Sequence, residues 1–170
     1  MADADAPAPA ASPPGNAIER LTRGIALAGG LLALGIAALV TTSVLRRWLF
    51  DQPIPGDFEF VQMATAIAVF AFLPLCQARG GNIIVDTFTS RLSAPSRNRL
   101  DAVWSLVYAG FMAVVSIGLF KGATEAFGYG TTTMVLGLPI WPAIAASALL
   151  CAVLVLVTLA TALELVRGRS

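Results

Sequence analysis

Four long apolar stretches divide this chain, with charged side chains confined to their ends. They predict membrane-spanning helices over residues 24–45, 58–78, 101–122 and 140–164. The first has 22 residues, which as an α-helix reach about 33 Å and so cross a hydrocarbon core of roughly 30 Å. Asp57 is the expected N-cap of the second helix, with Glu59 in its first turn. The pattern therefore predicts an all-α integral membrane protein with four transmembrane helices.

A fifth, shorter pattern lies between the second and third spans. Over residues 82–93, apolar side chains recur at helical spacing at Ile84, Phe88 and Leu92, with polar residues on the opposite side. About 12 residues are too few to cross a bilayer, so this segment predicts a short amphipathic helix lying in the interface with membrane lipids. The Gly- and Thr-rich stretch 126–140 predicts a connecting loop.

The two ends of the chain and its basic residues predict the orientation. Residues 1–20 begin Ala/Pro-rich without apolar periodicity and predict a disordered cytoplasmic tail, and residues 165–170 form a second tail. With four spans, eight basic residues fall on the same side of the membrane as the two termini. The opposite side has three basic residues, Arg46, Arg47 and Lys121. The positive-inside rule therefore places both termini in the cytoplasm.

Composition excludes several functions. The chain is 57% hydrophobic and 12% charged with a net charge of +1, which gives no basic excess for nucleic acid. It has no histidine, so His-ligated haem, His-zinc chemistry and Ser-His or Cys-His catalysis are all excluded. We expect no cofactor, no metal site and no enzymatic activity. The interior of the spans also lacks the ionisable groups that an ion-coupled carrier usually places at mid-membrane.

Small and polar residues within the spans predict helix contacts. Gly29, Ala33 and Ala37 repeat every four residues, a spacing that lets helices approach closely. Gln62 and Thr65 are the notable polar side chains of the second span. Such groups more often hydrogen-bond to another helix or to the backbone than form a transport site, so we interpret both as packing residues.

The segment after the second span carries a resemblance. It has the form R-G-G-[HN]-I-x-V-D, carried by Arg79, Gly80, Gly81, Asn82, Ile83, Val85 and Asp86. The carboxylate of Glu59 at the start of the second span also contributes to the resemblance. With this topology, the chain from about Thr22 to Leu165 resembles the small membrane (DctQ-type) subunit of tripartite ATP-independent periplasmic (TRAP) transporters. That family often has histidine at the position of Asn82, so this chain does not depend on an imidazole there.

The resemblance implies a complex in the bacterial inner membrane with two partners, a large multi-span permease subunit and a periplasmic solute-binding protein. The large subunit would carry the substrate and ion sites of a symporter for organic acids, and this chain would be part of its stationary scaffold. The candidate interface residues are Glu59, Arg79, Gly80, Gly81, Asn82, Asp86 and Phe88. Two of them have simpler readings, Asn82 as a helix N-cap and Asp86 as a solvated residue. The alternative function is a stand-alone small membrane protein, either an assembly factor or a lipid-interacting protein.

Overall fold

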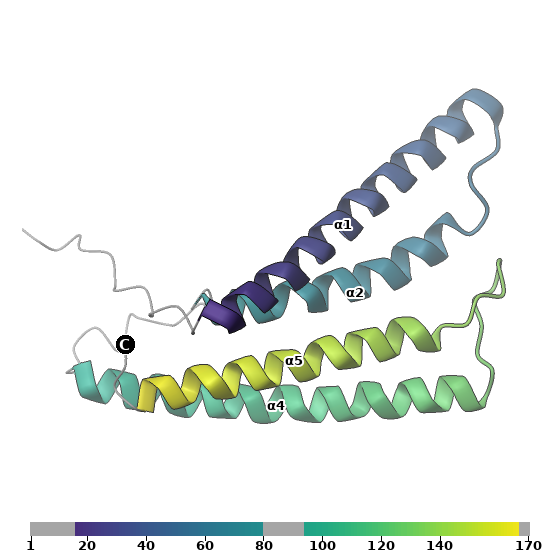
Figure 1. The fold of residues 1–170 in the computed structure, drawn as a ribbon. Coiled ribbons are helices and arrows are strands. Elements are labelled where there is room, and N and C mark those ends of the chain that lie inside the picture. The colour runs from purple at the N-terminus through teal and green to yellow at the C-terminus, as the bar shows by residue number, and fades with distance from the viewer. Residues whose placement is uncertain (1–15, 80–93, 167–170) are drawn as a thin grey trace, which may run out of the picture.

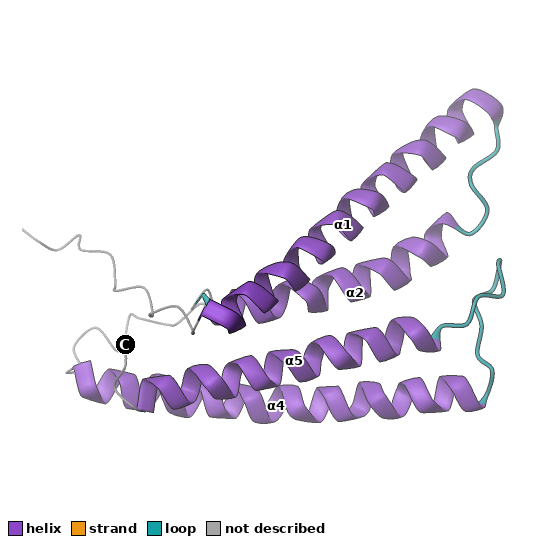
Figure 2. Cartoon of the chain, in the orientation of Figure 1, coloured by secondary structure: helices purple, strands orange, loops and turns teal. Residues whose placement is uncertain are grey.

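The structure, a computed structural model, describes residues 16–79 and 94–166 and consists of long helices joined by loops (Figure 1). The helices are α1 (Asn16–Phe50), α2 (Asp57–Ala78), α4 (Ala94–Gly128) and α5 (Trp141–Val166). Within the described ranges there is no strand, only an isolated β-bridge between Thr132 and Pro139 (Figure 2). The amphipathic helix predicted over 82–93 lies outside the described residues.

All four helices are long and apolar enough to cross a membrane. The prediction of an all-α protein with four apolar, membrane-crossing helices is therefore confirmed. Helices α1 and α4 each have 35 residues, about 52 Å at 1.5 Å per residue, and are longer than a hydrocarbon core requires. They extend beyond the helices against which they pack.

Two helices begin earlier than the apolar pattern indicated. Helix α1 starts at Asn16, inside the segment 1–20 that was interpreted as a disordered tail, and carries Glu19 in its first turn. Helix α4 starts at Ala94 rather than near residue 101, with Pro95 in the first turn. Proline is tolerated there because its missing N–H has no partner inside the helix. Adding a residue to an existing helix requires no new nucleus, so helices extend past the apolar segment that nucleates them.

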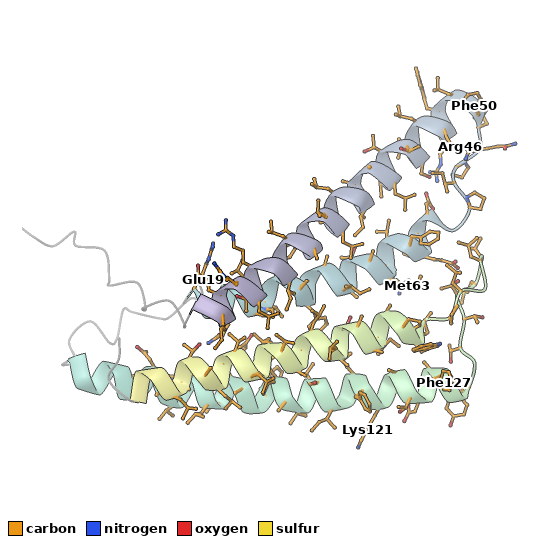
Figure 3. The ribbon with its side chains drawn as sticks, viewed as in Figure 1. Glu19, Arg46, Phe50, Met63, Lys121 and Phe127 are labelled. Atoms are coloured by element: carbon orange, nitrogen blue, oxygen red, sulfur yellow. The ribbon has the colours of Figure 1, made fainter. Side chains whose placement is uncertain are left out.

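The helices contact one another in the order α1, α2, α5, α4, which places α2 and α5 in the middle of a row (Figure 1). We call the end of the row that carries residues 51–56 and 129–140 the loop end. The opposite end, where α1 begins and α5 finishes, is the terminal end. Figure 3 shows Arg46 and Phe50 at the tip of α1 at the loop end, and Glu19 at the terminal end.

Small residues bring α1 and α2 together. A Cβ atom placed on Gly29 would lie 2.8 Å from Cβ of Ala71, so the two backbones approach as closely as a glycine allows. This confirms the predicted contact for Gly29, whereas Ala37 from the same stripe is exposed. Helices α4 and α5 are tied by the Ser116 hydroxyl, which donates to the carbonyl of Ala148 at 3.1 Å.

The burial pattern is the inverse of a water-soluble domain. Buried apolar positions are mostly alanines, whereas large side chains such as Leu31 (71% exposed) and Val114 (69% exposed) face outward. Contiguous exposed apolar surface of this extent is not stable in water. Lipid is the solvent that this surface suits.

Candidate functional site

The carboxylate of Glu59 organises the loop end. Glu59 lies in the first turn of α2 and is only 7% exposed. Its Oε1 accepts the backbone N–H of Val135 at 2.5 Å, and its Oε2 accepts that of Leu136 at 3.1 Å. Both donors belong to the loop between α4 and α5, more than 70 residues away in sequence. The carboxylate therefore ties the α4–α5 pair to the start of α2.

The segment that Glu59 holds is a compact hairpin, residues 131–140, which we call the outer hairpin. Its two arms are joined by the N–H of Thr133 donating to the carbonyl of Leu138 at 2.9 Å. The hydroxyl of Thr133 also accepts the N–H of Leu138 at 3.0 Å. Gly137 has a φ of 64°, a conformation that few residues other than glycine adopt. Local bonds thus present the N–H groups of Val135 and Leu136 in one direction.

The end of α4 sets the direction of the outer hairpin. Gly130 has a φ of 60°, and its N–H donates to the carbonyl of Phe127 at 3.2 Å. The N–H of Thr131 reaches back to the carbonyl of Ala126 at 3.0 Å. This pair of bonds is the Schellman motif, which ends a helix and reverses the chain. The ring of Phe127 packs edge-on against Trp141 at 5.4 Å, so aromatic side chains brace both bases of the hairpin.

A close apolar contact accompanies the Glu59 hydrogen bonds. The N-cap of α2 is Gly56, with φ 72° and ψ 12°. A Cβ atom on Gly56 would lie 2.3 Å from Cδ1 of Leu136, so the leucine side chain occupies the space above the glycine. The expectation that Asp57 is the N-cap of α2 is wrong, since the N-cap is Gly56 and Asp57 is the first helical residue.

Asp57 instead joins α2 to α1. The hydroxyl of Ser43, which is buried, donates to the Asp57 carboxylate and accepts the N–H of Ile54 at 3.2 Å. The other oxygen of Asp57 accepts the N–H of Phe58 at 2.7 Å. Because Ser43 lies beside the start of α2, the last seven residues of α1, all exposed, extend past it.

Of the other candidate residues, the structure describes Arg79, which lies away from this site. Arg79 follows the last turn of α2 at the terminal end and is exposed, with its N–H donating to the carbonyl of Leu75 at 3.1 Å. Gly80, Gly81, Asn82, Asp86 and Phe88 lie outside the described residues. Of the two predicted interface residues that the structure describes, Glu59 belongs to the loop-end site and Arg79 does not.

Sequence reasoning missed the partners of Glu59. The stretch 126–140 was expected to be a loop, and its glycines at 130 and 137 were a signal for turns. Nothing in the local pattern indicated which distant carboxylate would accept its N–H groups. In the part of the chain that the structure describes, no group of histidine, cysteine and acidic side chains could hold a metal ion. The contacts that define the site are hydrogen bonds between chain segments.

The geometry describes a membrane protein whose two helix pairs are held together at one end. The family described as "Tripartite ATP-independent periplasmic transporters, DctQ component" matches residues 36–168. This range contains residues 36–50 of α1 and all of α2, α4 and α5. The chain belongs to the DctQ family. No curated protein and no solved structure shows significant similarity to it.

Membership in the DctQ family decides the class of the molecule. It is the small membrane component of a TRAP transporter and not an enzyme, and its four apolar helices make it a multi-pass membrane protein. Family membership implies association with a large permease subunit and a periplasmic binding protein. The Glu59 site is then a structural feature of a transporter subunit.

Proposed function

We propose that this DctQ subunit is the fixed scaffold of an ion-coupled TRAP transporter in the bacterial inner membrane. The transporter imports an organic-acid solute that the periplasmic protein delivers. The family match over residues 36–168 is the observation that carries the proposal. The scaffold role is supported by the chain itself, since residues 60–78 and 102–120 contain no ionisable side chain except those of cysteine and tyrosine. A subunit that itself translocated ions is expected to place such groups at mid-membrane.

The internal ties of the loop end also support a scaffold. Glu59 joins α2 to the outer hairpin, and Ser43 joins α1 to the start of α2. These hydrogen bonds add to the packing of neighbouring helices. A part that stays still while a neighbouring subunit moves benefits from such cross-links, because packed elements resist continuous deformation.

For the orientation, we propose that both termini are cytoplasmic and that the loop end faces the periplasm, because eight of the 11 basic residues lie on the terminal side. Met134, at the tip of the outer hairpin, is 101% exposed and provides the test. In a variant whose Cys76 and Cys151 are replaced by alanine, a cysteine at position 134 should react with a membrane-impermeant maleimide added to whole cells. Labelling only after the cells are broken would reverse the orientation.

For the terminal side, we propose that Arg79, Gly80, Gly81, Asn82, Asp86 and Phe88 contact the large subunit or lipid headgroups. The deciding experiment for the function is purification of the tagged chain from cells that express the neighbouring transporter genes. A large multi-span protein should co-purify in equal amount, and deletion of the chain should abolish uptake of a panel of labelled carboxylic acids. A chain that purifies alone, and whose deletion leaves uptake unchanged, would refute the function.

A further inference from the structure

One face of α2 is exposed along the whole length of the helix. The exposed residues of this face follow one another along the sequence at alternating spacings of four and three, so their side chains lie on one side of the helix. Phe58 is 74% exposed, Val69 52% and Phe72 42%. The face, which we call the Gln62 face, consists of the exposed residues Phe58, Gln62, Thr65, Val69, Phe72 and Cys76. Buried residues on the opposite side of α2 include Ala71, Pro74 and Ala78.

Gln62 distinguishes this face from the others. It lies five residues inward from Asp57, which places it about 7 Å below the start of the helix at 1.5 Å per residue. Thr65 is nearly one turn deeper on the same face. Among the residues that the structure describes, neither the carboxamide of Gln62 nor the hydroxyl of Thr65 has a hydrogen-bond partner. A carboxamide carries two donors and two acceptor lone pairs, none of which is matched within the described part of the chain.

Other hydroxyl groups in the spans show how such groups are usually satisfied. Thr41 and Thr42 are exposed like Gln62, but each donates to the carbonyl four residues earlier in α1, at 2.8 Å. Thr158 does the same in α5. The side chain of Gln62 has no comparable bond within α2. Its exposure in an apolar span therefore favours a partner beyond the described helices, because unmatched polar groups are costly in hydrocarbon.

The exposed faces of α4 and α5 have a different character. On α5 the most exposed side chains of the span are Leu149, Leu156 and Leu163, which repeat every seven residues. On α4 they include Val107, Phe111, Val114 and Ile117. These side chains are apolar and can pack against lipid acyl chains without leaving a polar group unpaired. The Gln62 face differs from these two faces in carrying an unmatched carboxamide.

We infer that the Gln62 face is the surface on which a membrane-spanning segment of the large permease subunit docks, with the Gln62 carboxamide hydrogen-bonding a polar side chain or free backbone carbonyl of that segment. This inference rests on the proposed function, which supplies the partner. The central position of α2 in the row supports the inference. A partner that docks on α2 contacts the helix that the hydrogen bonds of Glu59 and Ser43 join to its neighbours.

The experiment places a photo-reactive phenylalanine analogue at position 62 of the tagged chain, co-expressed with its transporter partners. The matched control is position 38. Ala38 is exposed on α1 and lies five residues inward from Ser43, which bonds to Asp57, so both positions have the same depth. We expect irradiation to produce an adduct with the large subunit from position 62 and much less from position 38.

Substitution gives an independent readout. Gln62→Leu makes the span more apolar, so insertion of α2 is not impaired. Interhelical hydrogen bonds of this kind in membranes correspond to about three- to fifteen-fold in association. We expect Gln62→Leu to reduce the affinity for the large subunit within that range, with Ala38→Leu leaving it unchanged.

Three results would overturn the inference while leaving the proposed function intact, provided that the large subunit still co-purifies. The first is an adduct with a second copy of this chain, the second is an adduct with lipid alone, and the third is equal yield from positions 62 and 38. If no large subunit co-purifies with the unmodified chain, the proposed function itself fails.

Discussion

The contact between Gly56 and Leu136 offers a quantitative test of the loop end. Gly56→Ala adds one methyl group at a residue with φ 72°, where a Cβ would lie 2.3 Å from Cδ1 and 2.4 Å from Cγ of Leu136. Two separate penalties follow. The backbone is left-handed, which L-residues other than glycine rarely adopt, and the leucine side chain must leave its place.

The structure sets the size of each penalty. A left-handed conformation costs a non-glycine residue about 1–2 kcal/mol. Leu136 is 39% exposed, so moving it away forfeits part of the roughly 1.5–3 kcal/mol that full burial of a leucine contributes, or about 1–2 kcal/mol. Together, Gly56→Ala should destabilise the protein by about 2–4 kcal/mol.

A double-mutant cycle with Leu136→Ala separates the two penalties. The alanine at 136 removes the obstructing atoms, so Gly56→Ala in that background should cost only the backbone strain, about 1–2 kcal/mol. Gly56→Asn is a further control, because asparagine tolerates the left-handed region but retains the collision. The measurement is the free energy of unfolding in detergent, followed by the fluorescence of the 3 tryptophans. An equal cost of Gly56→Ala in both backgrounds would refute the steric part of the argument, and no cost in either would refute the whole.

Three further predictions concern the other contacts. Glu59→Ala should speed hydrogen exchange at the amides of Val135 and Leu136 towards that of unprotected amides, because their acceptor is lost; unchanged exchange would show that the carboxylate does not hold the hairpin. Gly29→Val should destabilise the α1–α2 pair by about 1–3 kcal/mol through overpacking against Ala71, whereas Gly35→Val, which meets nothing within 4 Å, should not; similar unfolding temperatures for the two would contradict this. Ser43→Ala should lower the thermal midpoint more than Thr42→Ala, because Ser43 joins Asp57 and Ile54 whereas Thr42 bonds only within its helix; the opposite order would count against the tie.

The sequence was sufficient for the class and the elements of this protein. Hydropathy is a property of short segments, and an apolar run of about 20 residues has one common solution in a bilayer, the α-helix. The four helices therefore followed from the apolar runs, and the contact of Gly29 followed from its spacing. The motif around Arg79 and Asp86 indicated the family that residues 36–168 confirm.

Tertiary structure alone decided how these elements are joined. The decisive contacts join residues that are distant in sequence. Helices α2 and α5 form the middle of the row, Glu59 holds Val135 and Leu136, and Ser43 bonds to Asp57. Each depends on helix register and on the backbone direction of a loop, which no local pattern encodes. Gln62 shows the difference most clearly. Its sequence position predicted a hydrogen bond to another helix or to the backbone. Only the packing of the four helices shows that the described residues provide no partner for it, because Gln62 lies on an exposed face of α2.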